Sequence, residues 1–343
     1  MLRSQIAKEK LKKLISALSG TEEIKLPPER TLAEKLGYSR STIVKVLNEL
    51  ESEGVVVRKI GSGTFIRHDV FSGVPCFAVV MRRTYYRSDE HFRKLIETLS
   101  VCAREQGVNI RIFDNLLESF AGDAAENKLL QEIRSKSIQG VLIISRLPLS
   151  VTSCLSSLLP TVAINNIFGD GSEVHCISCD YFRTGFLAGK YLAEKGHKKI
   201  AFVTDDLNHP ESSVEFSGFQ AALENAGIPL SEDDILETRH NAESIMDRTG
   251  DFFRSSGYTA GFIRNAFLLS PFLQALNEYG MTGKLDIVVS GYYDNYARRG
   301  WKLAVIDNKL EEMCRLGLQQ LIRLAAGDRI LMPNLILLKP ELL

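Results

Sequence analysis

The chain has 343 residues, 45% of them hydrophobic and 24% charged, which is typical of a globular protein. This composition excludes a largely disordered chain, and no apolar run approaches the roughly 18 residues needed to span a bilayer. The first residues contain no apolar stretch typical of a secretory signal, and most of the six cysteines lie in apolar segments, as reduced thiols do. We therefore expect a cytoplasmic protein of two or three domains that does not enter a membrane.

The formal net charge of zero hides an asymmetry along the chain. Residues 1–68 hold 13 Lys and Arg against 8 Asp and Glu, an excess of +5, and the rest of the chain carries the balancing −5. A small basic head on a larger acidic body is typical of a chain whose head meets a polyanion.

The head predicts three helices and a two-stranded ribbon. The first helix covers residues 4–18, with apolar side chains on one face, and a short second helix follows at residues 29–36. Ser39 is placed to cap a third helix that runs to about Glu53. The expected buried residues of the first and third helices are Ile6, Leu11, Leu14, Ile15, Leu18, Ile43, Val46, Leu47 and Leu50. Two short apolar segments around Gly61-Ser62-Gly63 predict the ribbon.

The remainder of the chain has a different pattern. Residues 68–75 contain Gly and Pro without periodicity and predict a linker. From residue 76 onward, short apolar runs such as CFAVVM, GVLIIS and IAFVT alternate with helical patterns. This alternation predicts a doubly wound parallel α/β body whose sheets are buried on both faces.

The segment LPPERTLAEKLGYSRSTIVKVLNELESEG, followed by VVVRKIGSGTFI, closely resembles the winged helix-turn-helix of GntR-type transcription regulators. The resemblance covers about residues 4–67 and implies a DNA-binding domain at 1–67, whose third helix enters the major groove of double-stranded operator DNA. The residues that it implies for DNA binding are Arg30, Ser39, Arg40, Ser41, Thr42, Lys45, Gly61, Ser62, Gly63 and Thr64. Many relatives carry a second base-reading arginine where this chain has Val44, and Lys45 faces elsewhere on the helix.

Residues 179–202, CDYFRTGFLAGKYLAEKGHKKIAF, are similar to a signature of LacI/GalR-type effector domains, which share the periplasmic-binding-protein fold. We expect Asp180 to cap the helix, Gly196 to end it, and Gly185, Ala188 and Gly189 to allow close helix–sheet packing. The resemblance spans residues 76–343 and implies two lobes, roughly 76–165 with 305–328, and 168–303 with 332–343. The chain is then expected to cross between the lobes near 165–168, 303–307 and 328–334.

In that fold the two lobes close on a small molecule. The residues that the resemblance implies for effector binding are His91, Phe92, Arg146, Asn165, Glu215, Phe262, Asn265 and Tyr293. Relatives often carry arginine at the position of Glu215 and aspartate at that of Tyr293. A glutamate accepts hydrogen bonds from hydroxyls or meets a cation, and a tyrosine ring stacks on a sugar face, so we expect a neutral saccharide or polyol. Because Arg146 could pair with a negative charge, an acidic sugar is the alternative ligand.

Other signals carry no chemistry. Cys176 and Cys179 have CxxC spacing but point to opposite faces of an expected strand, so we predict neither a metal nor a redox site. The paired acids Asp205/Asp206 and Asp233/Asp234 are expected to be solvated loop ends. The sequence contains no cofactor motif and no nucleophile–base set, so we expect no enzyme, no cofactor and no metal.

These observations together predict a homodimeric transcription regulator, a repressor whose operator binding a sugar effector controls. Three alternatives differ from it in class. An enzyme built on the α/β body lacks a catalytic motif. A GntR-type head on an all-helical acid-binding domain conflicts with the alternating strands. A regulator of the same fold with no small-molecule ligand, whose body serves only dimerisation, remains open because of Glu215 and Tyr293.

Overall fold

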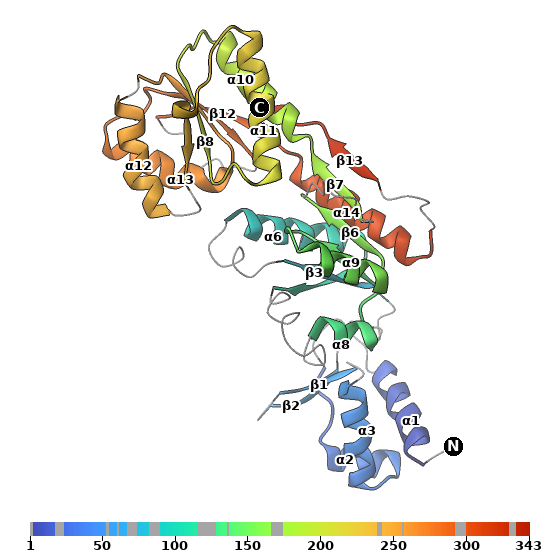
Figure 1. Cartoon of the computed structure of the whole chain (residues 1–343). Helices are drawn as coiled ribbons and strands as arrows, with labels where there is room; N and C mark the ends of the chain where they lie inside the picture. The colour runs from blue at the N-terminus through green and yellow to red at the C-terminus, as the bar shows by residue number, and fades with distance from the viewer. Residues whose placement is uncertain are drawn as a thin grey trace. The chain divides into compact units, whose positions relative to one another are not determined.

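The computed structural model describes residues 3–17, 24–52, 55–59, 62–66, 74–81, 90–114, 128–135, 137–165, 174–238, 242–255, 257–291, 300–328 and 334–343 (Figure 1). The chain divides into two compact units. One comprises Met1–Arg83, Ser100–Val162 and Leu318–Ile330, and the other comprises Thr84–Leu99, Ala163–Gly317 and Leu331–Leu343. Among the described residues, no helix is both long enough and apolar enough to cross a membrane.

The N-terminal part of the first unit is a three-helix head with a hairpin. Its elements are α1 (Arg3–Ala17), α2 (Glu29–Leu36), α3 (Arg40–Ser52), β1 (Val56–Lys59) and β2 (Gly63–Ile66). The two strands pair antiparallel, with Val56 opposite Ile66 and Lys59 opposite Gly63. Gly37 adopts a left-handed conformation, with φ of 73°, at the turn between α2 and α3. The predicted winged helix-turn-helix arrangement is confirmed.

A single apolar cluster holds the head together. It contains the four residues predicted for the buried face of α3, which are Ile43, Val46, Leu47 and Leu50. From α1 it takes Leu11 and Ile15 as expected, but Ile6 is 41% exposed and the adjacent Ala7 is buried in its place. The prediction for Ile6 is wrong by one position, because Ala7, Leu11 and Ile15 follow at four-residue spacing on one face of α1, and Ile6 lies about 100° around the helix from Ala7.

The rest of the chain alternates strands and helices. The strands are β3 (Cys76–Val80), β4 (Asn109–Phe113), β5 (Gly140–Ile143), β6 (Thr161–Ile164), β7 (His175–Cys179), β8 (Ile200–Thr204), β9 (Ile235–Glu237), β10 (Ala260–Ile263), β11 (Asp286–Ser290), β12 (Lys302–Asp307), β13 (Leu335–Leu338) and β14 (Glu341–Leu342). The helices are α6 (Glu90–Glu105), α8 (Lys128–Arg134), α9 (Leu149–Leu158), α10 (Tyr181–Glu194), α11 (Pro210–Asn225), α12 (Ala242–Ser255), α13 (Ala266–Glu278) and α14 (Leu310–Ala325), with a short 3-10 turn at Glu232–Asp234.

These strands form two six-stranded sheets, in the orders β13-β7-β6-β5-β3-β4 and β14-β12-β11-β10-β8-β9. Strand β3 runs parallel to both β4 and β5, and β8, β10, β11 and β12 run parallel in succession. The terminal β14 pairs antiparallel with β12. The predicted doubly wound parallel α/β architecture is confirmed, and an all-helical body is wrong.

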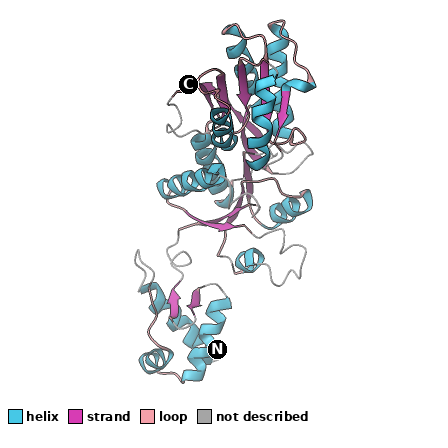
Figure 2. Cartoon of the chain, turned by 90° about the vertical axis from the view of Figure 1, so that its left-hand side faces the viewer, coloured by secondary structure: helices cyan, strands magenta, loops and turns pink. Residues whose placement is uncertain are grey.

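Alternating side chains of the second sheet bury both of its faces. Phe202, Phe262 and Val288 point to one face, where they pack with apolar residues of α10 and α11. Val203 and Ile287 point to the other face and pack with apolar residues of α12 and α13. Figures 1 and 2 show helices on both sides of this sheet. Because neighbouring side chains in a strand alternate between faces, a run such as IAFVT must be apolar throughout when helices cover both sides.

Helices α10 and α11 meet at the level of their backbones. A Cβ atom added to Gly185 would lie 1.8 Å from the carbonyl oxygen of Glu215, and one added to Gly218 would lie 1.9 Å from that of Phe182. Asp180 caps α10 as predicted, since its side chain accepts a hydrogen bond from the Arg183 amide at 3.0 Å. The prediction that Gly185 serves helix–sheet packing is wrong, because its missing side chain lets a second helix approach.

Candidate functional site

The first turn of α3 is organised by hydroxyl groups. Ser39 Oγ accepts a hydrogen bond from the Thr42 amide at 3.2 Å, which confirms Ser39 as the N-cap. The same oxygen lies 2.9 Å from Ser41 Oγ and 2.8 Å from Thr42 Oγ1. A capped helix terminus with several exposed hydroxyls presents backbone amides and O–H donors, which are the groups that bind phosphate.

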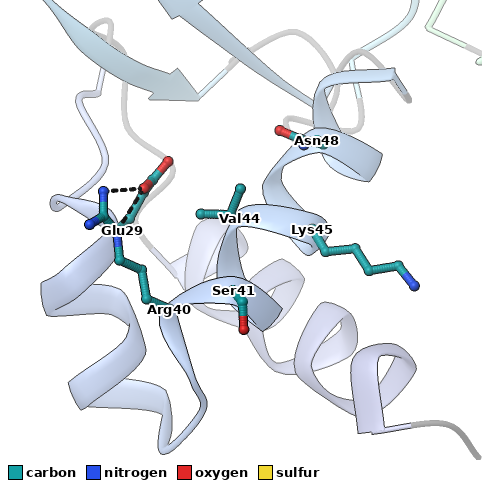
Figure 3. Close-up of a pocket in the computed structure, with 6 residues that line it drawn as sticks. All are labelled: Glu29, Arg40, Ser41, Val44, Lys45 and Asn48. Atoms are coloured by element: carbon teal, nitrogen blue, oxygen red, sulfur yellow. Dashed lines mark hydrogen bonds and ion pairs between the residues drawn. The ribbon is translucent and has the colours of Figure 1, made fainter.

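The exposed side of α3 borders an open hollow of about 590 Å³ (Figure 3). Its lining residues are Glu29, Arg40, Ser41, Val44, Lys45 and Asn48. The side chain of Arg40 is 72% exposed, and Ser41, Lys45 and Asn48 are exposed as well. Lys45 extends away from Val44, as the sequence predicts, yet it borders the same hollow.

One carboxylate connects three elements of the head. Glu29, the first residue of α2, accepts hydrogen bonds from Arg40 Nε at 3.3 Å and from Arg40 Nη2 at 3.2 Å. Its second oxygen lies 3.5 Å from Arg58 Nη2 on β1, and Arg58 also approaches Glu51 of α3. These ion pairs hold the guanidinium of Arg40 in a defined position on a surface that is otherwise open to solvent.

The turn of the ribbon depends on Gly63, whose φ is 116°, in the region that favours glycine. A Cβ atom at this position would lie 2.7 Å from Cε of Lys25, so the space that a side chain would need is filled by that lysine. The Leu26 amide donates to the carbonyl of Thr64 at 2.8 Å, which keeps the segment before α2 against β2. Lys25 is exposed and places a further cation beside the wing.

The remaining head candidates are placed as follows. Arg30 is 85% exposed on α2 and lies 3.7 Å from Glu34, one turn away. Ser62 is exposed and Thr64 is half-buried on β2. Gly61 lies outside the described residues. The head therefore presents Arg30, Arg40 and Lys45 to solvent.

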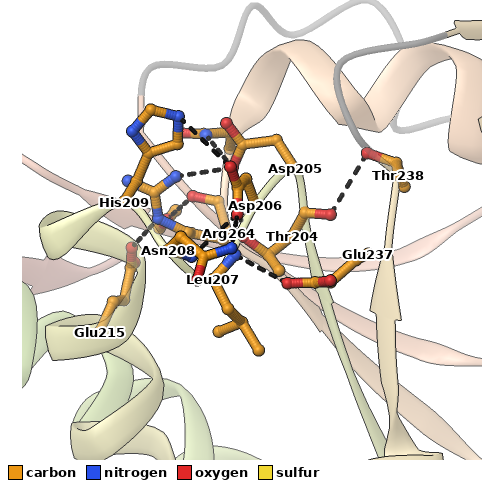
Figure 4. A network of polar contacts seen from close by, with 12 residues as sticks. Thr204, Asp205, Asp206, Leu207, Asn208, His209, Glu215, Glu237, Thr238 and Arg264 are labelled. Carbon is orange, nitrogen blue, oxygen red and sulfur yellow. Dashed lines mark hydrogen bonds and ion pairs between the residues drawn. The ribbon is translucent and has the colours of Figure 1, made fainter.

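A second group of polar residues lies at the carboxyl ends of β8 and β10 and on the first half of α11 (Figure 4). Arg264, which directly follows β10, is 8% exposed. Its Nη1 donates to Asp205 Oδ1 at 2.9 Å, and its Nε lies 3.1 Å from Glu215 Oε2. Asp205 also accepts a hydrogen bond from Thr204 Oγ1 at 3.2 Å. A buried guanidinium is thus held between two buried carboxylates.

Glu215 has an unusual environment. Only 1% of its surface is exposed, and its Oε1 has no hydrogen-bond partner among the described residues. Burial raises the pKa of the Glu215 carboxyl from its usual value of 4.5 to about 7, although the positive charge of Arg264 and the nearby hydroxyl of Ser290 act against this rise. An orphan buried carboxylate oxygen is costly, so this position is prepared to accept a hydrogen bond from an O–H or N–H group.

Two asparagines border the polar region. Asn265 stands at the N-cap of α13, yet its side chain makes no capping bond and instead donates from Nδ2 to Asp205 Oδ1 at 3.4 Å. Asn165 is half-buried, with φ of 56°, and accepts a hydrogen bond from the hydroxyl of Tyr181 at 2.7 Å. Asparagine tolerates this left-handed conformation better than most residues.

The structure corrects three expectations. Phe262 is fully buried and packs its ring 5.6 Å from that of Phe202 and 5.4 Å from that of Phe219, so it is a core residue rather than an effector contact. Asp205 and Asp234 are buried and paired rather than solvated, Asp234 with Lys199, Ser231 and Tyr258.

The other candidates are less informative. Arg146 is exposed after β5. His91 and Phe92 belong to α6, but their side chains, like the whole of Tyr293, lie outside what the structure describes. Cys176 and Cys179 are both buried in β7, and burial raises the pKa of the Cys179 thiol to about 12, which keeps it protonated.

Sequence reasoning missed Arg264, Glu29 and Lys25. Arg264 could have been found from the strand pattern, because it lies two residues beyond Phe262 and so shares its face of the sheet. Strands β8 and β10 are parallel neighbours with Val203 opposite Ile263, which places the residues that follow each strand side by side. The acid that follows IAFVT, Asp205, and the arginine that follows GFI, Arg264, could therefore have been predicted to form an ion pair.

Comparisons with known proteins agree with this architecture. The family "Bacterial regulatory proteins, gntR family" matches residues 3–66, and the family "Periplasmic binding proteins and sugar binding domain of LacI family" matches residues 78–292. An arabinose metabolism transcriptional repressor of Geobacillus stearothermophilus is 26% identical over 305 residues, which cover 84% of this chain and 81% of the relative.

Two solved structures share the fold. A LacI family transcriptional regulator from Enterococcus faecium with bound ribose has a TM-score of 0.64 and 19% identity, covering 78% of this chain and 96% of that one. A CelR–cellobiose complex has a TM-score of 0.64 and 18% identity, covering 93% and 98%. The second family spans more than half of the 343 residues. The chain therefore belongs to the LacI family of periplasmic-binding-protein-like sugar-binding domains, carried behind a head of the gntR family of bacterial regulatory proteins.

Proposed function

We propose that this chain is a sequence-specific transcription regulator, a repressor whose binding to operator DNA is controlled by a carbohydrate effector. The observation that carries the proposal is the exposed face of α3, where a capped helix terminus and the cations of Arg40 and Lys45 border one hollow. The arabinose metabolism transcriptional repressor supports the same function, because its similarity to this chain covers most of both proteins.

In this proposal α3 lies in the major groove. The guanidinium of Arg40 makes a bidentate contact with the O6 and N7 atoms of a guanine. Ser39, Ser41 and Thr42 bind phosphate with their hydroxyls and with the free amides of the helix terminus. Lys45 and Arg30 neutralise neighbouring phosphates, and the ribbon around Ser62 and Thr64 contacts the backbone beside the minor groove, so these groups position the head without reading sequence.

The experiment is a selection of duplexes from a random pool with the full chain, followed by fluorescence anisotropy on the enriched sequence. Arg40→Ala is expected to weaken binding by about 1–3 kcal/mol and to relax the preference at one base pair. Arg323→Ala, which removes a 64% exposed arginine outside the head, is the matched control and should bind like wild type. Failure to enrich any sequence contradicts the proposed function.

We further propose that the effector is a neutral sugar or polyol that contacts Glu215, Arg264 and Asn265. Arg264 already faces two buried carboxylates, so its charge is balanced and an anionic ligand gains little from it. A sugar hydroxyl can donate to the orphan Oε1 of Glu215. The two similar structures, one with bound ribose and the other a complex with cellobiose, support this ligand class.

The effector acts in this proposal by population shift. A ligand that binds one conformation of the body more tightly changes the fraction of protein able to hold DNA, by as much as its affinity differs between the two states. A thermal-shift screen over mono- and oligosaccharides identifies the ligand, and anisotropy with and without it measures the effect on DNA. If no saccharide or polyol raises the melting temperature, the alternative in which the body only dimerises replaces this part of the proposal.

We also propose that the chain binds DNA as a homodimer, in the cytoplasm, with its two heads on half-sites about one helical turn apart. Two linked heads raise the effective concentration of the second head, so a duplex with two half-sites binds far more tightly than a duplex with one. Sedimentation of the full chain with each duplex tests this. Equal affinity for both duplexes, with one chain bound to each, contradicts the dimer.

A further inference from the structure

Val44 lines the hollow beside α3 and, like Asn48, has no part in the roles above. Of the six residues that line the hollow, Val44 alone is apolar, and it is half-buried on the exposed side of the helix. Its neighbours Ile43, Val46 and Leu47 are fully buried in the core of the head. Val44 is therefore excluded from that core and keeps part of its side chain facing solvent in a polar hollow.

Helix geometry places Val44 next to the residue that reads guanine. At 3.6 residues per turn, Val44 lies about 40° around the helix from both Arg40 and Asn48, whereas Lys45 lies about 100° from Val44 and about 140° from Arg40. Figure 3 shows Val44 and Arg40 bordering the hollow on successive turns, with Lys45 extending to another side. A groove that receives Arg40 thus also receives Val44, while Lys45 is directed to the flanking backbone.

The chemistry of the major groove offers an aliphatic side chain a single complementary feature, which is the C5 methyl group of thymine. Valine has no donor or acceptor, so it leaves any donor or acceptor of a base that it covers without a partner, which disfavours guanine, cytosine and adenine edges. Arg40 and Val44 are separated by about 6 Å along the helix axis, and stacked base pairs by about 3.4 Å.

We propose that Val44 is a base-reading residue, which selects a thymine one or two base pairs from the guanine read by Arg40 through apolar contact with the thymine C5 methyl group. This inference rests on the proposed function as a DNA-binding regulator. It assigns the second specificity contact of α3 to van der Waals contact rather than to hydrogen bonding.

The test replaces each thymine of the selected duplex, one at a time, with deoxyuridine, which removes only the methyl group. For the full wild-type chain, one thymine within two base pairs of the Arg40-dependent guanine should show about four-fold weaker binding when replaced, equivalent to about 0.8 kcal/mol for one buried methyl group. Val44→Ala should bind the thymine duplex more weakly and should no longer distinguish thymine from deoxyuridine at that position.

Lys45→Ala is the matched control on the same helix. It should weaken binding to both duplexes equally, reduce the salt dependence, and keep the four-fold difference. If no thymine near the guanine is sensitive to deoxyuridine, or if Val44→Ala retains the full difference, the inference is overturned while the regulator function stands. A chain that enriches no sequence at all from the pool refutes the proposed function itself, and the assignment of Val44 with it.

Discussion

Replacing Arg264 by methionine should destabilise the body of the protein strongly. The substitution keeps an unbranched side chain of similar length but removes the cation between Glu215 and Asp205, which are 1% and 3% exposed. Removing one partner of a buried ion pair costs about 3–5 kcal/mol, because the remaining charge is left uncompensated. For a domain of 150–250 residues this corresponds to a fall in melting temperature of roughly 6–20 °C.

The assay is thermal and urea unfolding of the full chain, followed by circular dichroism, at pH 5.5 and pH 8. The defect should be smaller at the lower pH, because protonation can remove the uncompensated negative charge of the two buried carboxylates. Adding Glu215→Gln to Arg264→Met should cost less than the sum of the single changes, with a coupling of at least about 1 kcal/mol.

Arg323→Met provides the control for this reasoning. Arg323 pairs with Asp328 at 2.9 Å, a distance like that between Arg264 and Asp205, but the two side chains are 64% and 49% exposed. An exposed pair is worth about 0–1 kcal/mol, so this variant should melt near wild type. If Arg264→Met lowers the free energy of unfolding no more than Arg323→Met does, or if the effects of Arg264→Met and Glu215→Gln are strictly additive, the buried ion pairs do not stabilise the body.

Three further outcomes are expected. The free energy of unfolding of the wild type should fall, relative to that of Glu215→Gln, by up to roughly 3 kcal/mol as pH rises from about 4.5 to 7. The reason is that the raised pKa of Glu215 makes the folded state hold the proton more tightly than the unfolded state does. A pH series of urea unfolding measures this. Gly185→Ala should destabilise the protein by about 3 kcal/mol or more, since its Cβ would lie 1.8 Å from a backbone oxygen, whereas Gly261→Ala, whose Cβ would have ordinary contacts at 3.5 Å, should be tolerated far better; similar melting temperatures for the two contradict the tight crossing. Glu29→Gln should leave melting of the body unchanged and alter the affinity for operator DNA, because it loosens the guanidinium of Arg40; an affinity equal to that of wild type removes Glu29 from the positioning of Arg40.

Local features of the fold were readable from the sequence. The periodicity of α3 identified its four core residues because one face of a surface helix must bury its apolar side chains. The uninterrupted apolar run IAFVT identified a strand covered on both sides, since only a doubly covered strand is apolar at every position. The caps Ser39 and Asp180 were identified because their side chains satisfy amides in their own helices.

The polar cluster was not readable in the same way, because its partners are far apart in the chain. Arg264 and Asp205 meet only through the register of β8 with β10, which a single sequence does not encode locally. Glu215 belongs to the buried stripe of α11 with Phe219, so helical spacing indicates its burial, but nothing in that spacing names the cation that meets it. Because relatives often carry a ligand-binding arginine at the position of Glu215, the sequence comparison suggested a contact with the effector and not an ion pair within the chain.

The crossing of α10 and α11 has a consequence for how such a protein can diverge. Because Gly185 and Gly218 bring the two backbones into direct contact, no side chain separates the helices where they cross, and the distance between α10 and α11 there is set by the main chain. The Cα atom of residue 215 is thereby held at one place whichever amino acid occupies it. Under the proposed function, exchanging residues 215 and 264 as a pair would change the ligand without rebuilding the scaffold that carries them.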